Sequence, residues 1–473
     1  MRIPLAFNLE SRTNSTSKDS RIVNAYVDTE GQTKRVIKRP GLATFTVSPA
    51  LAVSSAQGMY AFRGTGKLYP VVSNTLYEVT TGGVSTNKGA VAAGLYSFVE
   101  TSSVPYLFLH NASNAYYLNG TSGTFTAISD VNFPTNQTPA YTLVPGAVYL
   151  DDTVYVMTTT GRIYNSAVED VSNGTWDALN FVEKTSEPDG GVAITKHLSY
   201  VLAFGQWSGE FFYDNANPTG SPLSRNDTAK MEIGCAAGMS VVQFSSAQSV
   251  VWLGQSRETG RAIYMLEGLA PKRISTKAIE GFLNADLLTN VRAWAVLIAG
   301  HPMYVLTLKD TGFTLVYDLH EKLWHQWTSD NGSGVEGFFN QEFFASLAGK
   351  SYLLNSTTGV VSTLSDTTYQ DLGVNINFRI VTPNLSGDSN KNKFMFSLEL
   401  IGDAFTSAGT ISIRHTDDDY QTWSAYRTVD MTKKRPIAYQ WGYFKRRALD
   451  IWSTVNLPIR LEAMEPNIVE GTL

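Results

Sequence analysis

A three-strand pattern recurs seven times along the chain, and it restricts the fold more than any other feature of the sequence. Each repeat has an apolar strand, a polar break, a second apolar strand, a turn of Gly, Asn or Asp, and a third strand with Tyr or Phe. Within the strands, apolar residues alternate with a period close to two, as in β-strands. The repeats occupy residues 61–83, 98–120, 147–167, 192–215, 241–266, 293–319 and 338–361.

A repeat of this kind cannot fold alone, because a small antiparallel sheet with two apolar faces leaves both in water. Repeats arranged radially bury both faces, and blades of a β-propeller need about 40 to 50 residues each. A series of β-sandwiches would need Pro/Gly-rich linkers, and residues 60–370 contain none. The sequence therefore predicts an all-β protein in which residues 46–371 form a β-propeller of about seven blades.

The strand pattern of the sequence changes after Asp371. Five longer strands are expected at 375–385, 394–402, 409–418, 437–453 and 458–466. Such a series predicts a separate β-sandwich-like domain over residues 372–473. Helix signals are sparse, and the strongest of them predicts a short connector within 277–291.

Charge is distributed unevenly along the chain. The net charge is −5 overall, with +4 over residues 1–45, −10 over 46–371 and +1 over 372–473. The stretch TKRVIKRPGLATF (33–45) places four cations directly before a Pro-Gly turn. We expect residues 1–45 to form a basic, extended arm that meets an acidic surface on its own propeller or on a neighbouring subunit. The cations of this stretch are Lys34, Arg35, Lys38 and Arg39.

A second basic group lies in the C-terminal domain, with Tyr439, Trp441 and Tyr443 between its two halves. These three aromatic residues share one face if 437–444 is a regular strand. The group is either an interface for a protein or nucleic acid, or a solvated sheet edge on which Lys and Arg block pairing. Its cations are Lys433, Lys434, Arg435, Lys445, Arg446 and Arg447.

Several functional classes receive no support. Cys235 is the only cysteine, so an internal disulfide is impossible. The N-terminal residues lack the apolar run of a signal peptide, and no run approaches the ~18 apolar residues of a transmembrane helix. No Gly-x-Ser-x-Gly elbow or phosphate-binding Gly-rich loop occurs.

Two short motifs have a structural explanation. HEKLWH (320–325) spaces its histidines one residue too far apart for a zinc-binding helix, and we expect a hairpin with Trp324 and Trp327 in the core. TDDDYQTW (416–423) resembles an Asp-box turn, although Tyr420 replaces the expected Gly. A solvated turn is favoured there over a Ca²⁺ site. We therefore expect no catalytic residues, no metal and no cofactor, although a carboxylate pair of a glycosidase is not excluded.

Several phrases of the sequence, in order, resemble a known family. Residues 20–45 contain Asn24-x-Tyr26 followed by Arg39-Pro40-Gly41-Leu42. A Trp-x-x-Leu-x-Phe strand, a Ser-x-Pro-Asp turn and the phrase AFGQWSGEFFYD follow within 176–214. In these features and in length, the chain resembles the packaged-DNA stabilisation proteins, which are the tail hub or nozzle proteins of short-tailed bacteriophages (podovirus tail accessory factors).

The resemblance implies a structural virion protein rather than an enzyme. It implies a homo-oligomeric ring, a hexamer, below the portal adaptor ring protein in the tail. The ring would extend the DNA channel, help to retain packaged DNA, let double-stranded DNA pass at ejection, and carry a tail fibre or spike and a needle or plug protein. It also implies assembly in the host cytoplasm without membrane insertion.

Two alternatives stay open at this stage. A propeller that binds or hydrolyses glycans as a tail component would use aromatic platforms and carboxylates. A DNA-binding module would use the basic segments, although the acidic body and the lack of a recognition helix disfavour it.

Overall fold

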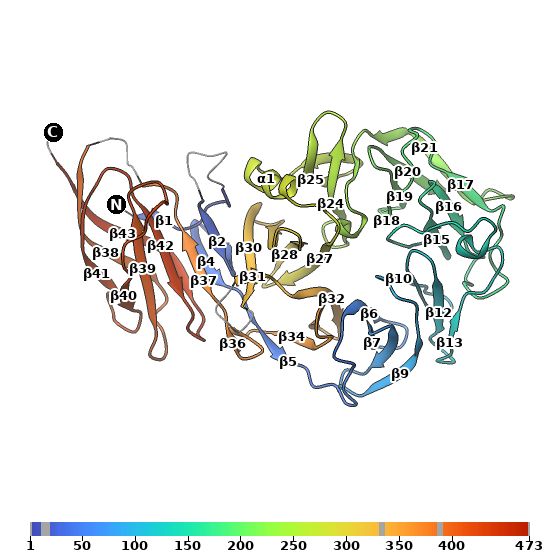
Figure 1. Ribbon diagram of the computed structural model, residues 1–473, viewed down its shortest axis with the longest axis horizontal. Coiled ribbons are helices and arrows are strands. Elements are labelled where there is room, and N and C mark those ends of the chain that lie inside the picture. The colour runs from blue at the N-terminus through green and yellow to red at the C-terminus, as the bar shows by residue number, and fades with distance from the viewer. Residues whose placement is uncertain (1, 11–18, 331–335, 386–390, 472–473) are drawn as a thin grey trace.

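The computed structural model describes residues 2–10, 19–330, 336–385 and 391–471, and it consists of a ring of small sheets beside a β-sandwich (Figure 1). Seven antiparallel blades form the ring, so the sequence repeat correctly predicted a β-propeller. Each of the first six repeats falls within one blade, and the seventh falls within the last blade apart from its first residues.

The strands of the first three blades are, in chain order, β6 (Ala56–Phe62), β7 (Lys67–Val72), β8 (Thr75–Val79) and β9 (Ser85–Ala90); β10 (Ser97–Glu100), β11 (Tyr106–His110), β12 (Ala115–Asn119) and β13 (Phe125–Ala127); and β14 (Val148–Leu150), β15 (Thr153–Met157), β16 (Arg162–Asn165) and β17 (Phe181–Glu183). The fourth and fifth blades contain β18 (Ala193–His197), β19 (Tyr200–Phe204), β20 (Gly209–Asp214) and β21 (Leu223–Met231); and β22 (Gly234–Cys235), β23 (Val242–Phe244), β24 (Ser249–Ser256), β25 (Gly260–Glu267) and β26 (Ala270–Arg273).

The sixth blade contains β27 (Val291–Ile298), β28 (His301–Leu308), β29 (Phe313–Asp318) and β30 (Leu323–Asp330), with β31 (Glu336–Phe338) paired to β30. Before it, α1 (Lys277–Ala285) covers the apolar space between blades 5 and 6. This helix is the short connector expected within 277–291, and the Thr276 side chain caps its N-terminus by accepting from the amide of Ile279.

The seventh blade is built from both ends of the propeller segment. Its strands β32 (Gln341–Leu347), β33 (Lys350–Asn355) and β34 (Val361–Ser365) are joined by β5 (Gly41–Thr44), which pairs antiparallel with β34. Short strands β35 (Gln370–Asp371) and β36 (Val374–Asn375) extend this sheet. An N-terminal strand therefore closes the ring, a feature that the sequence repeat did not reveal.

Apolar clusters between neighbouring blades hold the ring together. Blades 4 and 5, for example, bury Phe204, Phe211 and Trp252 in one cluster, and comparable clusters fill the other six junctions. Each buried large side chain contributes about 1.5–3 kcal/mol. These clusters cover both faces of every blade, which explains why a single repeat could not fold alone.

The segment 1–45 is not an extended arm, and the expectation of one is wrong for its described residues. Strands β1 (Ile3–Pro4), β3 (Ala25–Glu30) and β4 (Thr33–Lys38) pair in the sandwich sheet β3-β4-β43-β38-β41, in which β1 pairs with β43. Strand β2 (Arg21–Val23) joins the other sandwich sheet, and β5 belongs to the propeller. The apolar residues Ile22, Val27 and Val36 are fully buried, so hydrophobic burial outweighs the local positive charge.

The remaining strands complete the sandwich, whose two sheets enclose one apolar core. They are β37 (Phe378–Val381), β38 (Lys393–Gly402), β39 (Thr410–Thr416), β40 (Arg427–Asp430), β41 (Ile437–Phe444), β42 (Ala448–Ser453) and β43 (Arg460–Glu470). One sandwich sheet continues into blade 6, because β2 pairs with both β37 and β30. In Figure 1 the sheet with β38, β41 and β43 lies on the side away from the propeller, beside both termini.

Candidate functional site

The basic stretch near the N-terminus is divided between surface and interior. Lys34 is exposed and lies 3.5 Å from Glu321, whereas Arg35 is half-buried and pairs with Glu30 and Glu462. Lys38 and Arg39 are each only 1% exposed. As expected, Lys34 and Arg39 meet acidic residues of the propeller segment, Glu321 and Asp371, but Lys38 and Arg39 are buried, so an assembly interface that includes these two residues is wrong.

Arg39 connects the sandwich to the propeller. Its guanidinium donates to both carboxylate oxygens of Asp371, at 2.9 and 2.5 Å, and to the carbonyl oxygen of Thr328 at 3.3 Å. The same group lies 4.8 Å from the ring centre of Phe339. An arginine can fill such a site because its planar fork pairs with a carboxylate while its face contacts an aromatic ring.

Asn24 forms hydrogen bonds to both Arg39 and Thr328 at the joint between sandwich and propeller. Its side-chain oxygen accepts from Arg39 Nε at 3.1 Å and from the Thr328 amide at 2.9 Å, and its amide nitrogen donates to the Thr328 hydroxyl at 2.7 Å. Asn24 also has a φ of 54°, a conformation that Asn tolerates better than most residues. The Asn-x-Tyr and Arg-Pro-Gly phrases thus meet in space and hold the joint between the two domains.

Lys38 faces the sandwich interior. Its ammonium nitrogen lies 2.6 Å from the carbonyl oxygen of Val455. Burial, together with the neighbouring guanidinium of Arg39, lowers the pKa of Lys38 to about 7. This lysine is therefore a titratable group at the base of the sandwich rather than a surface contact.

The C-terminal basic group is mostly exposed. Arg435 pairs with Glu399 at 2.6 Å and Arg446 with Asp419 at 2.9 Å. Arg447 is the exception, because it is 1% exposed and forms a bidentate pair with Asp417. The exposed members are Lys433, Lys434, Arg435, Lys445 and Arg446.

Exposed aromatic side chains accompany these cations. Tyr443 is 75% exposed, Tyr439 63% and Phe396 49%, and Phe394 contacts the rings of both Phe396 and Tyr443. Val469 of the adjacent strand β43, which pairs with Phe394, is also exposed. We call Phe394, Phe396, Tyr439, Tyr443, Val469 and the five exposed cations the basic–aromatic face. It belongs to the sandwich sheet that lies away from the propeller (Figure 1).

The expectation that Tyr439, Trp441 and Tyr443 share one face is wrong. Gln440 and Gly442 have φ values of 64° and 75°, and these conformations break the strand alternation of β41. Trp441 consequently enters the core while the two tyrosines stay outside. Phe394 and Phe396 were missed, although their i, i+2 spacing in KFMFSLEL was a signal for a shared strand face.

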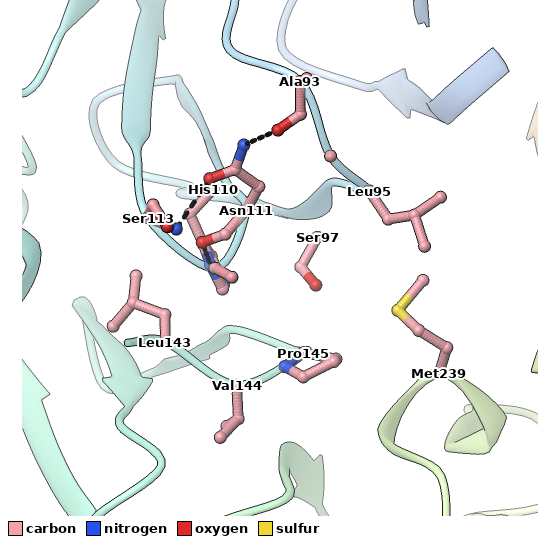
Figure 2. A pocket seen from close by; sticks show the side chains of 12 residues that line it. Ala93, Leu95, Ser97, His110, Asn111, Ser113, Leu143, Val144, Pro145 and Met239 are labelled. Atoms are coloured by element: carbon pink, nitrogen blue, oxygen red, sulfur yellow. Dashed lines mark hydrogen bonds between the residues drawn. The ribbon is translucent and has the colours of Figure 1, made fainter. Parts of the chain in front are cut away.

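One cavity of about 250 Å³ lies between the inner ends of several blades (Figure 2). Its lining brings Leu143, Pro145 and Met239 together with His110 and Asn111. The His110 ring nitrogens lie 2.8 and 3.1 Å from backbone carbonyl oxygens, and burial lowers the pKa of this histidine. No carboxylate is among the described residues that line the cavity, so it holds no acid–base pair.

The HEKLWH segment forms the hairpin that the sequence predicted. Strands β29 and β30 flank a tight turn, and Trp324 and Trp327 are buried in the core. His325 is buried, and burial lowers its pKa to about 4, whereas His320 is largely exposed. Among the described residues no group of three or more His, Cys, Asp or Glu side chains could hold a metal ion.

The TDDDYQTW segment forms a carboxylate-capped turn. Asp418 accepts hydrogen bonds from the hydroxyl and amide of Thr422, from the hydroxyl of Thr416 and from the amide of Gln421, which hold the pKa of Asp418 well below its usual range. Tyr420 adopts a φ of 66°, the conformation that explains the Gly expected there. In the described part of the chain, no helix is long and apolar enough to span a membrane.

Fold and surface together define a class of protein: a seven-bladed propeller closed by an N-terminal strand, fused to a sandwich that carries the exposed basic–aromatic face. The family model described as bacteriophage P22 Gp10, beta-propeller, matches residues 23–369 of this chain. The chain therefore belongs to the phage stabilisation family, and it is a structural phage-tail protein.

Solved structures resemble the chain only in fold. The extracellular domain of BT3049 from B. thetaiotaomicron is 9% identical, with 85% of this chain and 49% of that chain covered and a TM-score of 0.46. The Pan2 WD40 domain of Neurospora crassa is 8% identical, with 72% and 97% covered and a TM-score of 0.42. No curated protein matched the chain.

Proposed function

We propose that this protein is a ring-forming hub or nozzle of a short-tailed phage, and that it binds neighbouring virion proteins through the basic–aromatic face. The observation that carries the docking proposal is the exposure of Tyr443 and Phe396 on the sheet of β38 and β41, with exposed cations such as Lys434 and Lys445 in the segments that flank β41. Aromatic side chains are enriched at the centres of protein interfaces, where they bury a large area at low entropic cost.

The partner of this face has an acidic surface with an apolar centre. The face combines exposed rings with cations, so it would attract a surface of opposite charge at its rim. The propeller of a second copy is one such surface, because residues 46–371 carry a net charge of −10. A portal adaptor ring and a fibre, spike, needle or plug protein are the other partners that this function requires.

The acidic propeller also suits a channel through which DNA passes. Phosphate contacts with Lys and Arg trap DNA, whereas a wall of like charge does not. We propose a ring of six copies, assembled in the host cytoplasm, that extends the DNA channel and helps to retain the packaged genome.

Genetic complementation tests this function. A phage lacking the gene is grown in cells that express either the wild-type chain or the double variant Phe396→Ser and Tyr443→Ser. The wild-type chain should restore infectious particles that contain it, and the variant should be soluble but absent from the particles. The control Tyr213→Ser removes a propeller tyrosine that is 38% exposed and should restore infectivity. Normal incorporation of the double variant would contradict docking through this face.

Glycan binding is a second candidate function, favoured by a hollow of about 460 Å³ between blades 4 and 5. The hollow is lined by Trp207, Tyr264, Glu232 and Glu258, a combination of aromatic rings and carboxylates that suits a sugar. A glycan array probed with the wild-type protein and with Trp207→Ala tests it. Binding lost in the variant would support this function, and an array without binding would reject it.

A further inference from the structure

Three charged side chains are buried together where blades 3 and 4 meet, at the point where the sequence phrases Ser-x-Pro-Asp and AFGQWSGEFFYD come together. Lys184 follows strand β17, Asp189 lies in the loop before β18, and Glu210 belongs to β20. Their side chains are 0%, 2% and 1% exposed. Burying three charges is costly, so the arrangement calls for an explanation beyond ordinary surface pairing.

The Asp189 carboxylate contacts the ammonium group of Lys184 through one oxygen. Its second oxygen accepts from the backbone amides of Trp207, at 2.7 Å, and Ser208, at 2.9 Å. Two amides directed at one carboxylate oxygen form the geometry that stabilises the oxyanion of a tetrahedral intermediate in acyl transfer. The Ser208 hydroxyl also donates toward this carboxylate.

The backbone is shaped to receive this carboxylate. A Cβ atom on Gly205 would lie 2.5 to 2.6 Å from the carboxyl atoms of Asp189, closer than any real contact. Only glycine therefore allows the carboxylate to rest against the turn that supplies the two amides. The fold therefore fixes the position of the carboxylate, with one of its oxygens against Lys184.

A proton acceptor stands beside the amine. Glu210 Oε1 lies 3.8 Å from Lys184 Nζ and accepts from the Ser186 amide at 2.9 Å. The other oxygen, Oε2, has no hydrogen-bond partner among the described residues and lies 3.8 Å from Arg225 Nη1. Cations therefore lie on both sides of the Glu210 carboxylate.

We propose that Lys184 and Asp189 form an intramolecular isopeptide bond, with Glu210 as the proton carrier. Glu210 takes one proton from the Lys184 ammonium, and the free amine attacks the carboxyl carbon of Asp189. The negative charge that develops is held on the oxygen bound by the Trp207 and Ser208 amides. The C–O bond to the oxygen nearest Lys184 then breaks, and this oxygen leaves as water.

The proton balance of this step closes within the site. The leaving oxygen receives two of the three ammonium protons, one through Glu210 and one from the attacking nitrogen, and the third stays on the new amide. Glu210 ends ionised, as it began, and neither an oxidant nor a reductant is needed. The bond would close the segment 184–189 into a covalent ring beside the wall of blade 4.

Mass spectrometry of the full-length wild-type protein tests the bond. We expect an intact mass lower by one water molecule than the mass of the sequence. Trypsin should not cleave after Lys184, so residues 163–196 should appear as one peptide that is also lighter by one water. An unmodified intact mass, with separate peptides 163–184 and 185–196, would overturn the proposal.

Matched variants test the roles of the residues. Glu210→Gln keeps the shape of the side chain but removes the proton acceptor, so it should give the full sequence mass and normal cleavage after Lys184. A crosslink in that variant would overturn the role of Glu210. The Lys67–Glu78 pair, at 2.6 Å but more exposed, is the internal control, and trypsin should cleave after Lys67 normally.

Discussion

Arg39 and Asp371 lie 332 positions apart in the sequence, and their side chains form a bidentate ion pair at the joint of propeller and sandwich. The Arg39 side chain is 1% exposed and that of Asp371 17%. Residue 39 ends the sandwich portion of the N-terminal segment, and residue 371 lies in β35, the short strand that extends the seventh blade. The pair therefore ties together the two points at which the chain enters and leaves the propeller.

Removing one partner of this pair should destabilise the protein strongly. Arg39→Met removes the guanidinium that pairs with Asp371 and donates to Asn24, and we expect the free energy of unfolding to fall by about 3–5 kcal/mol. Differential scanning calorimetry should show a lower unfolding temperature. The control Arg435→Met removes an arginine that is 68% exposed, so its ion pair with Glu399 should contribute at most about 1 kcal/mol. Equal effects of the two substitutions would contradict the structural role of Arg39.

The closure of the seventh blade should depend on the absence of a side chain at Gly41. A Cβ atom there would lie 2.4 Å from the carbonyl oxygen of Gln370, a contact that requires the backbone to move. Gly41→Ala should therefore speed amide exchange in β34 and lower the unfolding temperature. Gly337→Ala is the matched control, because nothing lies within 4 Å of its Cβ position. Unchanged exchange in Gly41→Ala would argue against closure by β5.

Lys38 should make stability depend on pH above neutrality. Its pKa is about 7 in the folded chain and has an ordinary value of 10.5. Between these values the unfolded chain binds the proton and the folded chain does not, so the contribution of Lys38 to stability rises with pH from about 7 to 10.5 and is constant below 7.

The effect of Lys38 on the free energy of unfolding is at most about 1.4 kcal/mol per pH unit. Unfolding temperatures at pH 7 and pH 9.5 should therefore differ more in the wild-type protein than in Lys38→Met. Lys434→Met, which removes an exposed lysine, should behave as the wild type does. A wild-type pH profile in Lys38→Met would show that Lys38 is not the titrating group.

The blades were predictable because each one repeats the same strand pattern, in which period-two alternation marks two buried faces. The closing strand β5 could not be predicted, because Gly41–Thr44 are four residues without a repeat signal. Their partner β34 lies more than 300 residues away in the sequence. Local pattern can identify a strand of this kind but cannot assign its neighbour.

Charge in the sequence was a poor guide to exposure. Lys38 and Arg39 stand beside two other cations, which favours a surface, yet Asp371 and the carbonyl oxygen of Val455 allow both to be buried. The Ser-x-Pro-Asp phrase was visible in the sequence, whereas its contact with Lys184 and Glu210 arises only from folding. Only part of the basic–aromatic face could be predicted from the sequence: its cations and Tyr443 were identified, and Phe396 was not.

Footprinting of the assembled tail tests whether the basic–aromatic face binds other virion proteins. Hydroxyl radicals oxidise exposed aromatic side chains, so Tyr443 and Phe396 should react readily in the isolated chain. In purified virions we expect the chain to be present and both residues to be protected. Oxidation of Tyr213 in the propeller shows whether the radicals reach the chain at all. Virions without the chain, or Tyr443 and Phe396 as reactive in virions as in the isolated chain, would contradict the docking proposal.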